Sequence, residues 1–152
     1  MMQTQISLDP QKRKAALDIL AAAPAAALAA LWHDWAEKPK HFKVRGPEIG
    51  LVMVRGRAGG GGAPFNLGEA SVSRASVRLA TGEVGHGYCL GRDLAKAEII
   101  AVIDGLWQRD PVGVETQILE PLSALAKAAD DKVRGEAAAT RVDFFTMVRG
   151  AN

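Results

Sequence analysis

The stretch ASVSRASVRLATGEVGHGYCL, from Ala70 to Leu90, decides the fold class of this chain. Small or β-branched residues alternate with arginines in its first half, and glycines alternate with larger side chains in its second half, which is the period of two typical of β-strands. The Thr81-Gly82 pair between the halves indicates a tight turn. We therefore predict an antiparallel hairpin with strands from Ala70 to Ala80 and from Glu83 to Leu90.

Two further strands are expected before this hairpin, from His41 to Arg45 and from Ile49 to Arg57, joined by a turn at Gly46-Pro47. The segment Ala58–Gly68 contains four consecutive glycines and is expected to be a long, flexible connection. Adjacent glycine N–H groups can cradle a phosphate, but no Gly-Lys-Ser/Thr follows, so the mobile connection is favoured over a phosphate site. The sequence thus predicts a small antiparallel sheet of about four strands.

Helices are predicted on both sides of the sheet. Asp9-Pro10 has the residue types of a helix start, so a first helix is expected from Pro10 to Ala22, and a second begins near Pro24. Together they form a helical hairpin over about residues 10–37. A helix over about 93–109 and another over about 121–140 follow a sheet that spans about 41–90. The predicted fold is α+β, in a single domain of residues 1–152.

Composition restricts the function classes. The chain has 19 basic and 17 acidic residues, and this near balance argues against a dedicated nucleic-acid or membrane-surface protein. Cys89 is its one cysteine, and no Cys/His spacing resembles a metal site. Lys12-Arg13-Lys14 and the apolar run after it resemble a signal peptide, but Asp18 and Pro24 interrupt that run. We expect a cytoplasmic protein without a metal, a membrane or a nucleic acid as partner.

Arginines gather in the predicted sheet and provide the best ligand or interface candidates: Arg55, Arg57 and Arg74. Alternation places Arg55 and Arg57 on one face of their strand, where guanidinium groups suit phosphate or carboxylate partners. The alternative is that these arginines are solvated and pair with nearby acids such as Glu48. That alternative is favoured, because exposed ion pairs are common on sheet surfaces.

No catalytic residue is predicted. None of the three histidines has a recognisable motif around it, and alternation in the last strand suggests that His86 is a core or interface residue rather than a general base. Cys89 falls on the opposite face, with Gly85 and Gly87. Small residues there predict close backbone packing, and the thiol is expected to be buried and inert.

The segment RVDFFTMVRG, from Arg141 to Gly150, is an unusually apolar tail for a chain terminus. A terminal segment is ordered only when something holds it, so this tail is expected to pack on its own core or on a partner, and both alternatives stay open. The residues proposed to dock are Val142, Phe144, Phe145, Met147 and Arg149.

Several segments, taken in order, resemble one known family, the G subunit of the carbon–phosphorus lyase core complex (PhnG). The resemblance covers most of the chain. It rests on Glu48-Ile-Gly-Leu-Val-Met-Val-Arg-Gly-Arg57, Ala63-Pro-Phe-Asn-Leu-Gly-Glu-Ala70, Ser73-Arg-Ala75, Val77-Arg-Leu79, Gly91-Arg-Asp93, Ala97-Glu98, Asp104 and Arg141-Val-Asp-Phe-Phe-Thr-Met-Val-Arg-Gly150.

This resemblance implies an accessory subunit of a transferase complex in phosphonate catabolism, assembled with the H, I and J subunits. With the I, H and L subunits, the family takes part in displacing adenine from ATP by methylphosphonate, giving α-D-ribose 1-methylphosphonate 5-triphosphate. ATP is then a substrate of the complex, and the chain has no cofactor of its own. The alternative from the residues alone is an autonomous nucleotide-binding enzyme that uses the Arg/His face of the sheet.

Overall fold

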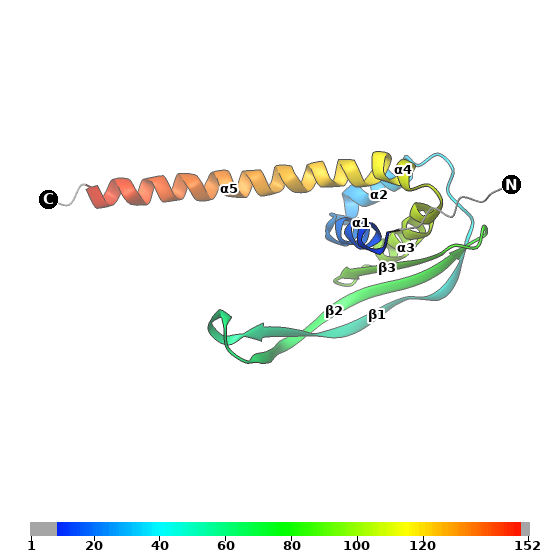
Figure 1. The fold of residues 1–152 in the computed structure, drawn as a ribbon, viewed down its shortest axis with the longest axis horizontal. Helices are drawn as coiled ribbons and strands as arrows, with labels where there is room; N and C mark the ends of the chain where they lie inside the picture. The colour runs from blue at the N-terminus through cyan, green and yellow to red at the C-terminus, as the bar shows by residue number, and fades with distance from the viewer. Residues whose placement is uncertain (1–8, 150–152) are drawn as a thin grey trace.

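A computed structural model describes the backbone of residues 9–149 and the side chains of residues 9–140. Figure 1 shows an α+β arrangement, in which helices pack on one side of an antiparallel sheet and two long arms extend from that body. The elements, in chain order, are α1 (Pro10–Ala22), α2 (Ala25–His33), β1 (His41–Arg57), β2 (Pro64–Leu79), β3 (Val84–Leu90), α3 (Leu94–Arg109), α4 (Pro111–Val114) and α5 (Glu120–Arg149).

The sheet has three strands in the order β1-β2-β3, where about four were expected. The two strands predicted between His41 and Arg57 are one strand, because both halves pair with β2: His41 lies opposite Leu79, and Glu48 lies opposite Arg74. The turn predicted at Gly46-Pro47 is therefore wrong. These two residues form a bulge, in which Gly46 has a φ of 70° and the register shifts between Arg45 and Glu48.

The glycine-rich connection is shorter than the sequence predicted. A 3₁₀ turn covers Ala58–Gly60, and β2 begins at Pro64 rather than near Ala70. The strand starts early because residues 64–70 pair with the far end of β1, and Arg57 lies opposite Pro64. The predicted loop Ala58–Gly68 is thus partly strand. β1 and β2 form a long ribbon that extends beyond α1, α2, α3 and α4 (Figure 1).

The hairpin of β2 and β3 is confirmed, and α3 packs directly on it. Gly85 and Gly87 face α3. A Cβ atom at Gly85 would lie 1.8 Å from the Ala101 carbonyl oxygen, and a Cβ atom at Gly87 would lie 2.0 Å from the Ala97 carbonyl oxygen. The sheet and helix backbones therefore approach as closely as their atoms allow. The buried core beneath includes Leu20, Leu28, Val77, Leu79, Cys89, Ile100, Ile103, Ile118 and Leu119.

The first helix has the predicted bounds, and the Asp9 side chain accepts a hydrogen bond from the Gln11 backbone at 2.9 Å. The chain bends by 112° between α1 and α2, which makes the pair more open than an antiparallel hairpin. The Lys96 ammonium of α3 donates to the Ala21 and Ala23 carbonyls at this bend, at 2.9 and 2.6 Å. Within residues 9–149, no single helix is long and apolar enough to cross a membrane, and only the bent pair reaches that length and composition.

The last helical segment begins earlier than predicted. Asp110 ends α3 as expected, but α4 follows at Pro111 and leads through a π-helical turn, Glu115–Leu119, into α5. The helix was predicted to start near Pro121, so the prediction left out residues 111–120. In the sequence, a proline in the first turn of a helix cannot be distinguished from a proline inside a helix that continues through it. α5 then runs to Arg149 and includes the backbone of most of the predicted tail.

Candidate functional site

The ribbon of β1 and β2 between Ile49 and Ala70 is the first of two arms, and we call it the hairpin arm. Its helix-facing side is identified by register: Ile49 lies opposite Ser73, and Ser73 lies opposite the buried Cys89. Alternation places three exposed apolar side chains on this side, namely Ile49 (39% exposed), Leu51 (65%) and Met53 (54%). The register shifts between Val54 and Arg55, where the extra residue is Leu67 of β2; β1 has no extra residue, so its alternation continues to Arg55 and Arg57 near the tip.

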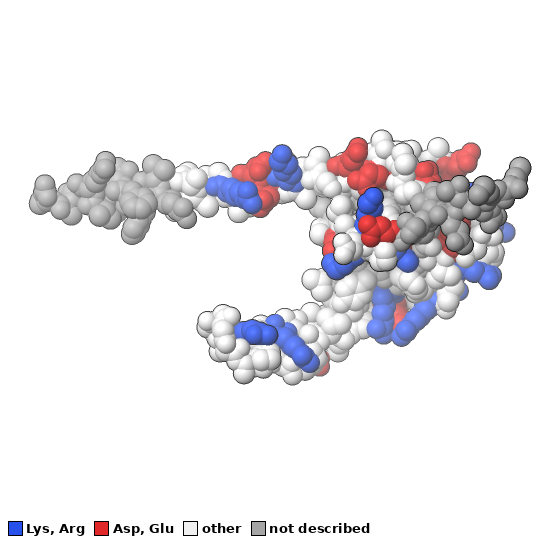
Figure 2. Space-filling view, viewed as in Figure 1, with Lys and Arg blue, Asp and Glu red and all other residues white. Residues whose placement is uncertain are grey.

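The second arm is α5. Leu122 is the last buried side chain of the part of α5 whose side chains are described, and every residue from Ser123 to Thr140 is exposed. Two apolar grooves of about 500 and 510 Å³ flank its first turns, where it leaves α1 and α2. Both arms extend from the same side of the body, and Figure 2 shows an open hollow between them. The arrangement has the shape of a clamp, and apolar side chains line its hairpin arm.

The structure does not bring the three predicted arginines together. Arg74 lies on the outer side of the sheet, with its guanidinium against the backbone of Gly50, whereas Arg55 and Arg57 alternate onto the helix-facing side. Arg55 is seven residues along β1 from Glu48, the position opposite Arg74, which is a distance of about 23 Å along the strand. The sequence therefore identified arginines of the sheet, but they form no single patch.

Arg74 is paired with an acid, as the favoured alternative predicted. Its Nε donates to Glu48 Oε1 at 2.8 Å, and Arg45 Nε donates to the same oxygen at 2.8 Å. The hydrogen bond from Arg74 is the main reason that the pKa of Glu48 lies below its usual value. This group of two cations and one anion is exposed, so its contribution to stability is small.

His86 lies on the outer side of β3 and is exposed, so the prediction of a core histidine is wrong; an interface role stays a prediction. The whole outer row of β3 is exposed because no element within residues 9–149 covers it. The His86 ring Nδ1 and the Ser76 hydroxyl are 2.8 Å apart across the β2–β3 pair.

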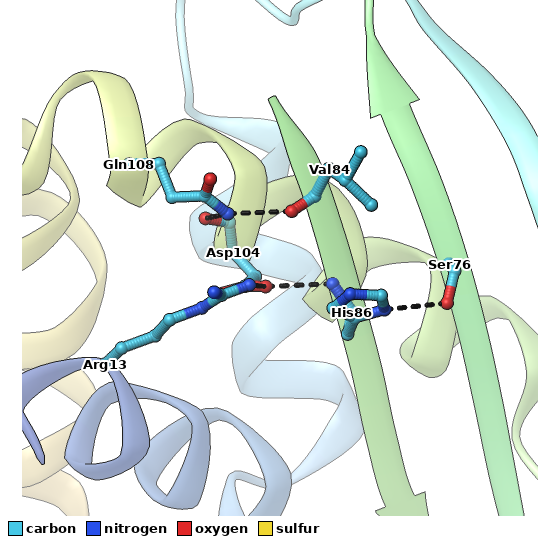
Figure 3. A network of polar contacts seen from close by, with 6 residues as sticks. All are labelled: Arg13, Ser76, Val84, His86, Asp104 and Gln108. Atoms are coloured by element: carbon cyan, nitrogen blue, oxygen red, sulfur yellow. Dashed lines mark hydrogen bonds and ion pairs between the residues drawn. The ribbon is translucent and has the colours of Figure 1, made fainter. Parts of the chain in front are cut away.

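A buried carboxylate that the sequence reasoning did not single out as a site connects three elements (Figure 3). Asp104 of α3 is 2% exposed and accepts two hydrogen bonds from Arg13 of α1, from Nε at 2.9 Å and from Nη2 at 2.7 Å. It also accepts one from the His86 backbone N–H at 2.8 Å. The hydrogen bonds that Arg13 donates to Asp104 raise the pKa of Arg13, against the opposing effect of partial burial.

This network has the geometry of a structural connection rather than a reactive site. Every Asp104 oxygen is satisfied, and the Gln108 amide nearby donates to the Val84 carbonyl at 2.8 Å. A sequence signal existed: Asp104 is a charged residue within the apolar stripe of α3. A buried charge of this kind needs a partner, but nothing local to α3 indicates that the partner is Arg13, 91 residues away.

Cys89 is fully buried, as predicted, and burial raises the pKa of its thiol. A raised pKa lowers the thiolate fraction at neutral pH and so lowers reactivity. The side chains of the tail candidates Val142, Phe144, Phe145, Met147 and Arg149 lie outside the described residues.

The comparison with known families identifies the chain. The family model of the phosphonate metabolism protein PhnG matches residues 11–150, which is nearly the whole sequence. The chain belongs to the PhnG family. A PhnG relative from Rhizobium meliloti (strain 1021), named alpha-D-ribose 1-methylphosphonate 5-triphosphate synthase subunit PhnG, is 52% identical over 140 residues, covering 91% of this chain and 90% of the relative. Both arms lie within the part of the chain that matches PhnG.

Proposed function

We propose that this PhnG-family chain is an accessory subunit of the α-D-ribose 1-methylphosphonate 5-triphosphate synthase of phosphonate catabolism, in the carbon–phosphorus lyase core complex. In that role it supports the transfer of methylphosphonate onto ATP with displacement of adenine. The observation that carries the proposal is the 52% identity, over 91% of the chain, to a relative that is named as a subunit of this synthase. ATP is the substrate of the complex, and this subunit contributes no cofactor of its own.

The contacts of the described residues support an accessory rather than a catalytic role. Two groups of charged residues form structural pairs: Asp104 accepts from Arg13, and Glu48 accepts from Arg45 and Arg74. Displacement at a sugar carbon requires a positioned nucleophile and stabilisation of a cationic sugar. We place that chemistry on a partner subunit.

The proposed partners are the H, I and J subunits, with L joining in the synthase reaction, in the cytoplasm. Arg55, Arg57 and Arg74 are the proposed contacts to a triphosphate or to a partner. Exposed apolar side chains on both arms support assembly, because monomeric proteins rarely leave long apolar segments uncovered.

The test is co-expression of this chain with the H, I and J subunits of the same organism, followed by affinity purification and size-exclusion chromatography with light scattering. We expect one large complex that contains this chain in stoichiometric amount. Synthase activity of the complex, with and without this chain, then measures the accessory role. A chain that elutes alone under these conditions contradicts the proposal.

The tail supplies a separate prediction. Replacing Phe144 and Phe145 with Ser should reduce co-purification if the tail docks on a partner, or lower the melting temperature of the isolated chain if it docks on its own core. Burial of each Phe stabilises by about 1.5 to 3 kcal/mol, so either effect is measurable. If the variant melts and assembles like the wild type, the tail is not part of the interface or of the core.

The outer side of the sheet favours a second candidate, an autonomous nucleotide-binding enzyme. Arg74, His86 and Tyr88 lie exposed there, and Arg78 stacks over the Phe42 ring with 6.0 Å between guanidinium carbon and ring centre. Guanidinium groups suit phosphates and aromatic rings suit bases. Calorimetric titration of the isolated chain with ATP tests it: saturable binding that Arg74→Ala removes supports this candidate, and no binding rejects it.

A further inference from the structure

Within residues 9–140, no side chain covers the surfaces of the hairpin arm and α5 that border the hollow between them. A two-stranded ribbon is marginally stable in water unless a further layer packs on it, yet the hairpin arm extends beyond the helices of the body, α1 to α4 (Figure 1). The α5 helix does not provide that layer, because its residues from Ser123 to Thr140 are exposed themselves. These surfaces are therefore open to another molecule.

The side chains on the helix-facing side of the hairpin arm indicate the chemistry of that molecule. Ile49, Leu51 and Met53 form an apolar row, and Arg55 and Arg57 continue it toward the tip. Figure 2 shows the basic residues at the end of this arm. Among the described residues, no carboxylate forms an ion pair with either arginine. The complementary surface is therefore an apolar segment with carboxylates at one end.

A second copy of this chain matches that description poorly. The hairpin arm between residues 49 and 70 carries two arginines and one acid, Glu69. The carboxylates on α5 alternate with cations: Asp130 already pairs with Arg134 at 3.1 Å, and Lys127 and Lys132 lie close by in sequence. A second α5 helix would bring these cations toward Arg55 and Arg57.

We propose that the hollow between the hairpin arm and α5 grips an apolar segment of a partner subunit, which packs on Ile49, Leu51 and Met53 and pairs its carboxylates with Arg55 and Arg57. This inference rests on the proposed function, because it takes the occupant from the synthase complex. The partner segment completes the layer that the hairpin arm lacks, and α5 closes over it from the other side.

The apolar row is tested with the double variant Leu51→Ser/Met53→Ser. Its matched control is Leu90→Ser, because Leu90 is 71% exposed on the outer side of β3 and therefore faces away from the hollow. Each variant competes with the wild-type chain for assembly with the H, I and J subunits. The competition gives the Kd of each variant for these subunits. We expect the double variant to bind about tenfold or more weakly and the control to bind within about twofold of the wild type.

The charge pairing is tested with Arg55→Glu/Arg57→Glu, and Arg92→Glu is the control at another exposed arginine. The reversed pair should weaken assembly by about tenfold or more, and its Kd should depend less steeply on salt than that of the wild type. A photo-crosslinking residue at position 51, in an otherwise wild-type chain, keeps the test valid if a variant misfolds. We expect it to crosslink to one partner subunit, whereas the same residue at position 90 should not.

The outcomes separate this inference from the function it rests on. If the wild-type chain assembles and both double variants assemble equally well, the hollow is not the docking site, although the proposed function stands. If the wild-type chain does not assemble, the proposed function fails and this inference fails with it. If light scattering shows a dimer of the isolated chain that Leu51→Ser/Met53→Ser abolishes, the occupant is a second copy and the inference is wrong.

Discussion

A single methyl group at Gly87 should separate α3 from the sheet. The Cβ atom of Gly87→Ala would lie 2.0 Å from the Ala97 carbonyl oxygen and 2.7 Å from the Ala101 nitrogen, whereas ordinary contact begins at 3.4 Å. Both atoms belong to the backbone of α3, so no side chain can rotate away. The helix has to move by about 1.4 Å or the strand has to bend by an equivalent amount.

That displacement opens a gap beneath fully buried side chains of α3, such as Ile100 and Ile103. A gap of about 0.5 to 1 Å already removes a quarter to a half of a dispersion contact. Overpacking of a core costs about 1 to 3 kcal/mol, and a clash with backbone belongs at the upper end of that range or beyond. A loss of about 3 kcal/mol in this size of chain lowers the melting temperature by roughly 6 to 12 °C.

The assay is thermal and urea unfolding of the purified variant, monitored by circular dichroism. Gly61→Ala is the matched control, because a Cβ atom at Gly61 meets nothing within 4 Å and its φ is negative, −128°. This control should change the free energy of unfolding by less than about 0.5 kcal/mol. A Gly87→Ala variant that melts within about 2 °C of the wild type refutes the close helix–sheet contact.

Three further predictions follow from the polar and titratable groups. Asp104→Ala should lower the free energy of unfolding by about 2 to 3 kcal/mol in urea denaturation, because it leaves Arg13 without its partner and Arg13 is only partly solvated; unchanged stability contradicts a structural role. Arg74→Ala should raise the pKa of Glu48 in a carbon-13 NMR titration. A lowered pKa in the folded state stabilises at high pH and that stabilisation is lost on acidification, so the wild type should lose its advantage over Arg74→Ala as the pH falls below about 4.5. The Cys89 thiol should react slowly with Ellman's reagent in the native chain and rapidly in urea, since burial raises its pKa; fast native labelling contradicts that burial.

The sequence predicted correctly those helix ends that are fixed by residues within one turn of them. Asp93 accepts from the Lys96 backbone at the start of α3, and Asp110 with Pro111 ends that helix where expected. Capping and proline act within one turn, so the sequence alone shows them. The alternation of Gly85, Gly87 and Cys89 likewise predicted a face of close packing, because the period of two is a property of the strand itself.

The candidate surfaces were only partly predictable. Sequence reasoning identified Arg55, Arg57 and Arg74, but their separation depends on the register of β1 with β2, including the shift between Val54 and Arg55. It identified neither the apolar row on the hairpin arm nor the hollow beside it. An exposed apolar strand and a buried one have the same sequence pattern, and only the extent of the helical layer distinguishes them.

The sequence by itself determined the α+β class, the PhnG resemblance, the helix caps and the close-packed face of β3, because each is encoded by residues near one another in the chain. The tertiary structure decided that β1 is a single strand, that Asp104 pairs with Arg13, that His86 faces outward and that an open hollow lies between two arms. Those features depend on contacts between residues far apart in sequence. Such contacts exist only once the sheet register and helix packing are set, so no local pattern encodes them.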